Sequence, residues 1–265
     1  MGFGFAFGCV VILAVVLWPG TGVAQSVPSA MDRPHELTSA EKESDPSTSA
    51  KDFVPDILRH QKVIWTFPFR IGEHLEPAIA VSVSAAALVA LDPHIAPHFQ
   101  NSRFDVYKTG ALRKQTMALT IAAVPVVTYV GGFLRKDEYA KETGFLAAEA
   151  IADTLILSTV IKGITGRTFP VQIPIQGDFT RTWFQYTGPA HDPGSFPSGH
   201  AISAYAVAAV YSSRYRHHRW VPFVAYGLAS LISLTRIPDQ THFPSDVFAG
   251  AALGYTIGKF VVVRH

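Results

Sequence analysis

The chain has 265 residues, enough for one large domain or two small ones. Hydrophobic residues make up 48% of it and charged residues only 16%, below the share of about a quarter that is usual in soluble domains. The formal net charge of +2, with no long run of Lys or Arg, argues against a nucleic-acid partner. The single cysteine, Cys9, excludes an intrachain disulfide and a cysteine-based metal site.

The N-terminal region opens with an apolar stretch over residues 3–18, followed by several small residues. Gly22 and Ala24 suit the small-residue positions of a signal-peptidase site, so residues 1–24 are interpreted as a signal peptide. The positively charged start typical of such peptides is missing, and an uncleaved anchor helix is the alternative. Either interpretation places the protein in or across a membrane.

Residues 25–70 are expected to form a polar linker. Up to about residue 60 this segment is rich in Ser, Pro, Asp, Glu and Lys and shows little periodicity. Such a composition buries too little apolar surface to offset the entropy lost on ordering. We therefore expect a disordered or loosely packed connection to the domain that follows.

Residues 71–265 contain long apolar stretches separated by Pro, Gly and charged residues. The stretches predict six helices, at about 73–92, 115–134, 144–163, 199–213, 219–236 and 245–263. No β alternation of comparable length and no internal repeat occurs. The sequence therefore predicts an all-α fold, a six-helix bundle in one domain.

Some of these helices approach the roughly 20 residues needed to cross a bilayer. Residues 117–134 form the most uniformly apolar candidate, with Pro125 as a kink. The next helix contains Glu149 and Asp153, and acidic side chains within a membrane cost free energy unless they face the bundle interior. Too little charge is present to coat a soluble bundle of this length. A transmembrane bundle is therefore favoured, with a soluble helical domain as the alternative.

A first polar cluster is expected where the third helix ends near Lys162, because Gly163 and Gly166 stop helices. Lys162 and Arg167 on this turn could bind a phosphate, the lysine as a point charge and the arginine through its planar fork. The alternative is that both are interfacial cations at a helix C-terminus.

A second cluster, Pro197-Ser198-Gly199-His200, opens the fourth helix. The unpaired first-turn amides and the Ser198 hydroxyl form an anion site, and Gly199 allows the anion to approach the backbone. His200 would then lie beside the phosphate and could protonate a departing oxygen. A plain helix cap with an incidental histidine is the alternative.

A third cluster follows the fifth helix, with Arg236 at its end, His242 six residues on, and Asp246 four beyond that. This spacing allows the Asp246 carboxylate to bind one imidazole nitrogen and leave the other free to attack phosphorus. A buried His–Asp hydrogen bond that only ties a loop to a helix is the alternative.

Taken in order, Lys-x4-Arg-x2-Pro, Pro-Ser-Gly-His and Arg-x5-His-x3-Asp span about residues 145–260. This pattern resembles the type 2 phosphatidic acid phosphatase / vanadium haloperoxidase superfamily. The resemblance implies a six-helix core, a phosphohistidine intermediate, and neither metal nor other cofactor. It further implies that His242 is the nucleophile, Asp246 its partner and His200 the general acid, with phosphate ligands at Lys162, Ser198, Gly199 and Arg236.

Two positions depart from the family pattern. The first motif usually has arginine immediately before the proline, and this chain has Phe169 there. Arg167, in the same turn, is expected to supply the missing guanidinium as a further phosphate ligand. Thr235 stands where serine usually precedes the arginine of the third motif.

The sequence thus predicts a phosphomonoesterase acting on a lipid phosphate: phosphatidic acid, phosphatidylglycerophosphate, an isoprenyl diphosphate or lipid A. Its partners would be the lipid substrate and the membrane, with no obligate protein partner evident. Aromatic residues between positions 171 and 195 suit an interfacial lid over the site, namely Phe179, Trp183, Phe184 and Tyr186. A soluble exported acid phosphatase, a vanadate-dependent haloperoxidase and a non-catalytic anion-binding membrane protein remain as alternatives.

The expected location is the cell membrane, with several spans and the site facing the periplasm or exterior. Arg214, Arg216 and Arg219 suit a cytoplasmic loop opposite such a site, whereas the cations at 103–114 would then lie outside. Six spans after a cleaved signal peptide would place the site in the cytoplasm. An uncleaved anchor, giving seven spans, or a soluble periplasmic domain would keep it outside.

Overall fold

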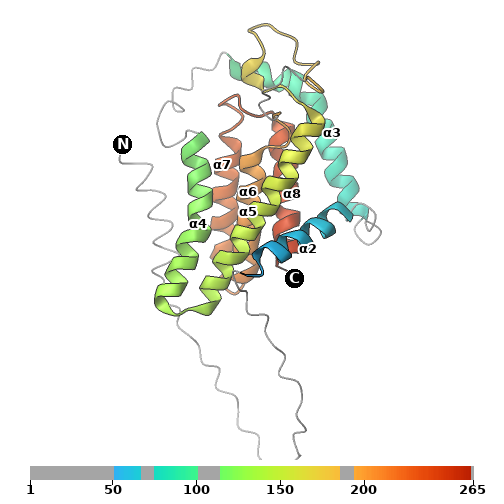
Figure 1. The fold of residues 1–265 in the computed structure, drawn as a ribbon. Helices are drawn as coiled ribbons and strands as arrows, with labels where there is room; N and C mark the ends of the chain where they lie inside the picture. The colour runs from blue at the N-terminus through green and yellow to red at the C-terminus, as the bar shows by residue number, and fades with distance from the viewer. Residues whose placement is uncertain (1–50, 67–74, 101–113, 186–193, 264–265) are drawn as a thin grey trace, which may run out of the picture.

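The computed structural model of the chain describes residues 51–66, 75–100, 114–185 and 194–263. Within these ranges the chain forms seven α-helices and no strand, so the predicted all-α class is confirmed (Figure 1). The helices are α2 (Phe53–Thr66), α3 (Leu75–Gln100), α4 (Lys114–Arg135), α5 (Glu138–Thr165), α6 (Gly199–Arg214), α7 (Trp220–Leu234) and α8 (Pro244–Thr256). A 3-10 turn, η3 (Pro170–Gln172), follows α5, and a π-helical segment, η4 (Ile257–Val262), continues α8. The signal peptide or anchor expected at 1–24 lies outside the described residues.

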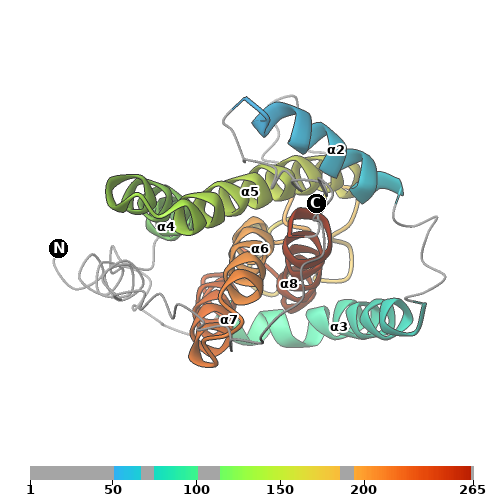
Figure 2. The same ribbon diagram turned by 90° about the horizontal axis from the view of Figure 1, so that it is seen from below.

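The α6 helix occupies the centre of the bundle, in contact with α5, α7 and α8 (Figure 2). The α4 helix pairs with α5, α3 packs against α8, and α2 crosses α5. Much of α6 consists of Ala, Ser and Val, and most of its residues are buried. Small side chains on the central helix let its neighbours approach closely.

The closest approach is that of α8 to α6. A β-carbon on Gly254 would lie 2.1 Å from the carbonyl oxygen of Ile202, and one on Gly250 would lie 2.8 Å from that of Ser198. Only glycine fits at such separations. The start of α6 is therefore held against α8. The N–H of Ser198 also donates to the carbonyl of Asp246 at 3.0 Å, which brings the second and third polar clusters together.

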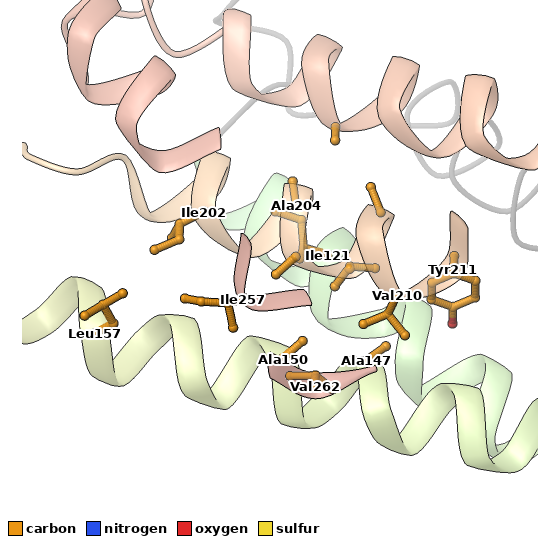
Figure 3. Packing of buried hydrophobic residues seen from close by; sticks show 14 residues of the cluster. Ile121, Ala147, Ala150, Leu157, Ile202, Ala204, Val210, Tyr211, Ile257 and Val262 are labelled. Carbon is orange, nitrogen blue, oxygen red and sulfur yellow. The ribbon is translucent and has the colours of Figure 1, made fainter. Parts of the chain in front are cut away.

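A core of aliphatic side chains fixes the same helices further along the bundle. Leu157 and Ala150 of α5 face Ile202 and Val210 of α6, and Ile257 lies among them (Figure 3). All five side chains are buried. The core thus sets the relative positions of α5, α6 and α8, whose ends hold the polar clusters.

The α5 helix begins and ends at recognisable caps. The Asp137 side chain accepts a hydrogen bond from the backbone N–H of Ala140 at 3.0 Å. At the other end Gly166 has a φ of 47°, in the left-handed region, and its N–H donates to the carbonyl of Lys162. The predicted stop at Gly166 is correct, whereas Gly163 lies inside the helix and Lys162 is one turn before its end.

The α2 helix occupies part of the segment that was expected to be a polar linker. It packs on α5 through the rings of Phe53 and Phe145, 5.5 Å apart, and through a 2.8 Å contact between His60 and Asp153. His60 and Asp153 are both buried. Because its partners lie far along the chain, α2 gave no strong signal in the local sequence.

The α3 helix continues beyond residue 92, where the sequence predicted its end, with Pro93 and Pro97 inside it. Its last turns are held by side-chain amides at the site end of the bundle. Gln100 donates to the carbonyl of Ile173 at 2.9 Å, and Gln240 donates to that of Phe99 at 2.9 Å. These tertiary contacts support a helix end that the prolines alone would disfavour.

Three helical segments are long and apolar enough to cross a membrane, namely Leu75–Gln100, Gln115–Arg135 and Glu138–Gln172. The α7 helix is apolar but shorter. Large aliphatic side chains of α3 are exposed, among them Leu75, Ile79, Val83 and Leu91. An apolar surface of this length fits hydrocarbon better than water and indicates association with a membrane.

Candidate active site

The three polar clusters meet at one end of the bundle, where residues 194–198 run between them. Lys162 donates to the carbonyl of Gly194 at 2.6 Å, and the N–H of Ser195 donates to the carbonyl of Arg167 at 2.7 Å. On the other side, Nδ1 of His242 lies 2.8 Å from the carbonyl oxygen of Ser195. The segment before α6 thus joins the end of α5 to the loop before α8.

His242 is buried, and its contacts define which ring nitrogen is available. A carbonyl oxygen can only accept, so Nδ1 must donate its hydrogen to Ser195. In the neutral ring Nε2 then has a free lone pair. Burial lowers the pKa of His242, against the opposing effect of the Asp246 carboxylate, and so favours this neutral form.

Asp246 lies beside His242 without forming a close hydrogen bond to it. Its Oδ2 atom is 3.7 Å from Nδ1 of His242 and accepts the backbone N–H of Phe243 at 2.9 Å. Burial alone would raise the pKa of Asp246, but the neighbouring His242 and Arg167 bring that pKa below its usual value. The carboxylate therefore stays charged and acts on the imidazole through its field, while the carbonyl of Ser195 orients the ring.

The second cluster forms the start of α6 as predicted. Ser198 is the buried N-cap, and its hydroxyl accepts the N–H of Ala201 at 3.4 Å. Its own N–H donates to the carbonyl of Asp246 at 3.0 Å, which ties the cap to the third cluster. A β-carbon on Gly199 would meet no atom within 4 Å, so open space adjoins the first turn where His200 also lies.

Arg236 is completely buried. Its Nε and Nη2 atoms donate to the hydroxyl of Thr235 at 3.2 and 3.0 Å, and Nη1 lies 3.4 Å from the carboxylate of Asp239. Its backbone carbonyl accepts the N–H groups of Thr241 and His242, both at 3.2 Å. The hydroxyl at position 235 thus orients the guanidinium, a task that serine could perform equally.

Phe169 stands close to both Lys162 and His242. Its ring centroid is 6.0 Å from that of His242 and 5.7 Å from Nζ of Lys162. The position where the motif usually has arginine is therefore adjacent to the imidazole. In this chain an aromatic face occupies it.

Arg167 is buried in a network within the protein. Its guanidinium lies between the rings of Trp183 and Phe243, 4.3 and 4.0 Å from their centroids. It donates to Asp246 at 2.5 Å and to Asp92 of α3 at 2.6 Å. Sequence reasoning missed Asp92, for which the one available signal was an aspartate within an otherwise apolar helix.

The segment expected to form a lid is described except for residues 186–193. Phe179 packs edge-on against Phe243, and Trp183 packs against Phe196, so these rings fill the loop. Phe184 differs, because it is 65% exposed. Within the described ranges, no three His, Cys, Asp or Glu side chains are grouped as a metal site would require.

Comparison with known proteins identifies the domain that these residues build. Residues 143–265, from α5 to the C-terminus, match the model of the PAP2 superfamily. The chain therefore contains a PAP2 superfamily domain, and all three polar clusters lie within it. The recognition made from the three motifs is confirmed.

The relatives with curated names are lipid A phosphatases. The lipid A 1-phosphatase of Porphyromonas gingivalis is 36% identical over 66 residues, 24% of this chain and 15% of that protein. The lipid A 4'-phosphatase of the same organism is 27% identical over 133 residues, 49% of this chain and 55% of that protein. The lipid A 1-phosphatase of Rhizobium etli is 35% identical over 99 residues, 37% of this chain and 40% of that protein. The match thus spans at most 55% of the length of these relatives. No solved structure matches the chain.

Proposed function

We propose that the protein is a membrane lipid phosphatase that releases phosphate through a phosphohistidine intermediate. The observation that supports this most directly is the setting of His242. Its Nδ1 atom donates to a carbonyl, a charged carboxylate lies beside the ring, and the first turn of α6 is adjacent. A buried neutral imidazole in such a setting is suited to nucleophilic attack.

In the proposed reaction, Nε2 of His242 attacks phosphorus and the bond from phosphorus to the lipid oxygen breaks. The imidazole becomes positively charged because Nδ1 keeps its proton, and the Ser195 carbonyl and the Asp246 carboxylate stabilise that charge. His200 gives a proton to the departing oxygen. His200 then accepts a proton from a water molecule, and the oxygen of that water attacks the phosphorus of the phosphohistidine. The bond from phosphorus to Nε2 of His242 breaks, and phosphate is released.

The phosphate would be held by Lys162, by the Ser198 hydroxyl and the first-turn amide of Gly199, and by Arg236. These groups combine two cations with the positive end of a helix. Arg167 was expected among these ligands, but its contacts with Asp92 and Asp246 favour a supporting task inside the protein. We therefore leave it out of the proposed phosphate site.

A lipid A-type phosphate is the first substrate candidate, because the curated relatives are named as lipid A 1- and 4'-phosphatases. The apolar helices that surround the domain would bring such a lipid to the site. Phosphatidic acid, phosphatidylglycerophosphate and isoprenyl diphosphates present the same terminal phosphate and are the alternatives to compare.

We propose that the site faces the periplasm or exterior. The opposite end of the bundle carries more cations than anions. Arg135, Lys136, Lys141, Arg214, Arg216 and Arg219 lie there, against Asp137, Glu138 and Glu142. Arg214, the last residue of α6, pairs at 2.5 Å with Glu142 near the start of α5, which ties the two helices together at this end. Positively charged loops favour the cytoplasmic side, and α5 is long enough, at about 40 Å, to separate the two ends across a bilayer. Of the cations at 103–114, those at 103–113 lie outside the described residues, and Lys114 is the first residue of α4.

A phosphate-release assay on the purified protein in detergent tests this function. Lipid A, phosphatidic acid, phosphatidylglycerophosphate and an isoprenyl diphosphate would be compared, with His242→Ala as the inactive variant and His218→Ala, at the basic end, as the matched control. We expect release from at least one lipid phosphate by the wild type and the control, and none by His242→Ala. Phosphate binding without release from any substrate would support a non-catalytic protein instead. Halide oxidation on addition of vanadate and peroxide would support a haloperoxidase.

A further inference from the structure

A buried charged network connects α3 to the carboxylate beside His242. Asp92 lies on α3 and is fully buried. Its Oδ2 atom accepts from Nη2 of Arg167 at 2.6 Å, and Nη1 of the same guanidinium donates to Oδ1 of Asp246 at 2.5 Å. One guanidinium thus bridges two carboxylates from different helices.

Asp92 also holds the first turn of α8 directly. Its Oδ1 atom accepts the backbone N–H of Ser245 at 3.2 Å, and the Ser245 hydroxyl donates to Oδ2. That hydroxyl in turn accepts from Nη1 of Arg167 at 2.7 Å. Ser245 immediately precedes Asp246, so Asp92 fixes both the backbone at Asp246 and the cation that binds its side chain.

The surroundings leave this network little freedom to rearrange. The Arg167 guanidinium is sandwiched between the rings of Trp183 and Phe243. It is 2% exposed, and its two carboxylate partners are both 0% exposed. Burying a guanidinium away from water costs free energy unless carboxylates neutralise its charge. Removing one of the two carboxylates would leave the charge of the buried guanidinium only partly neutralised.

We propose that Asp92 is a positioning residue for the reaction, holding the Asp246 carboxylate against His242 through Arg167 and Ser245. This inference rests on the proposed phosphatase function. Without Asp92, Arg167 is free to draw the Asp246 carboxylate away from the imidazole. The positive charge that forms on the ring when Nε2 attacks phosphorus then loses stabilisation. Asp92 is fully buried and is not among the proposed phosphate ligands, so we expect binding of the substrate phosphate to be unaffected.

The test is a comparison of Asp92→Asn with the wild type in the phosphate-release assay. Asparagine keeps an acceptor for the Ser245 N–H but loses the charge that binds Arg167. We expect kcat to fall about tenfold while KM changes by less than about twofold, as expected for an interaction made in the transition state. Asp153→Asn is the matched control, because Asp153 of α5 is equally buried but pairs with His60; its kcat should stay within about twofold of the wild type.

A double-mutant cycle separates positioning from a general loss of structure. In an Asp246→Asn background, Asp92→Asn should lower kcat by no more than about twofold further, because its route to His242 has already been removed. A tenfold loss in both backgrounds, a change confined to KM, or an unchanged kcat in the single variant would overturn the proposal.

Ser245→Ala provides a milder variant should Asp92→Asn fail to fold. It removes one of the two links and should lower kcat about threefold, again with little change in KM; an unchanged kcat would contradict the proposal. Failure of the wild-type protein to release phosphate from any lipid would count against the function itself. An active wild type with a silent Asp92→Asn would count against the positioning role alone.

Discussion

The imidazole of His242 is oriented by a backbone carbonyl, and a carboxylate beside it favours positive charge on the ring, so orientation and electrostatics come from different neighbours. Ser195 lies 2.8 Å from Nδ1, and Asp246 lies 3.7 Å from the same atom. The sequence predicted the aspartate, because it lies one helical turn after the histidine. It did not predict the carbonyl, because any residue type has one and residue 195 lies far from residue 242 along the chain.

The pH dependence of activity follows from the burial of His242. Its pKa lies below the ordinary value of about 6.5, and attack needs the neutral ring, so the acidic fall in kcat/KM should be centred below pH 6.5. Asp246→Asn removes the charge that favours the protonated ring. It should move the acidic fall to still lower pH and reduce the plateau on the order of 100-fold. A pH profile of kcat/KM for both proteins checks this, and an acidic limb centred above pH 6.5 in the wild type would contradict it.

Phe169 provides a test of what the missing arginine contributes. Its ring lies beside both His242 and Lys162, so an arginine there would bring a guanidinium to the proposed phosphate. We expect Phe169→Arg to raise kcat/KM about tenfold on a lipid phosphate, because a charge-assisted bond to the transferring group is gained. Phe169→Leu, which removes the ring without adding charge, is the control and should not raise kcat/KM. A loss of activity in Phe169→Arg would show that the aromatic face is itself required.

At the scale of helices, the local sequence predicted the elements that have apolar periodicity and clear caps. The α6 helix was expected at 199–213 and runs over Gly199–Arg214, and α4 was expected at 115–134 and runs over Lys114–Arg135. The α5 helix begins earlier than predicted because Asp137 caps it, ahead of the apolar stretch. The α2 helix and the end of α3 were missed because tertiary partners stabilise them.

The network around Arg167 likewise depends on tertiary contacts that the local sequence does not predict. The motif placed Arg167 near a phosphate, whereas its neighbours include Asp92, 75 residues earlier on another helix. No local pattern encodes that pairing. Only the packing of α3 on α8 brings the two side chains together.

The contact between α6 and α8 gives a prediction at this scale. A β-carbon at Gly254 would lie 2.1 Å from the Ile202 carbonyl oxygen, so Gly254→Ala must push the two helices apart. We expect a loss of about 1–3 kcal/mol in the free energy of unfolding, and a lower kcat because the first turns of α6 and α8 separate. Gly227→Ala on α7 is the control, because a β-carbon there meets nothing within 4 Å, and it should be neutral or slightly stabilising. Equal unfolding midpoints for the two variants in detergent would contradict the close-packing argument.

At the scale of the whole molecule, the bundle separates the end that carries the candidate site from a basic end. The two ends of α5 show this directly. Lys162 and Gly166 lie at one end, and Glu142, which pairs with Arg214, lies near the other. Apolar helices occupy the distance between them. This arrangement suits a protein that acts on a phosphate at the surface of a bilayer from one side.

Single-cysteine labelling tests the orientation. In a Cys9→Ser background, Ile175→Cys lies on an exposed loop at the site end, and His217→Cys lies on an exposed turn at the basic end. A membrane-impermeant maleimide should label Ile175→Cys in intact cells and His217→Cys only after permeabilisation, because basic loops stay in the cytoplasm. The reverse pattern would place the site inside the cell.

The most direct measurement of the central claim is to trap and map the phosphoenzyme. The protein is mixed with a lipid phosphate labelled in its phosphate group, denatured in alkali to preserve phosphohistidine, and digested for peptide mapping. We predict an acid-labile label on His242, absent from His242→Ala, and a label that still forms in His200→Ala when the leaving group needs no proton. Label that persists in His242→Ala, or turnover by that variant, would contradict the account.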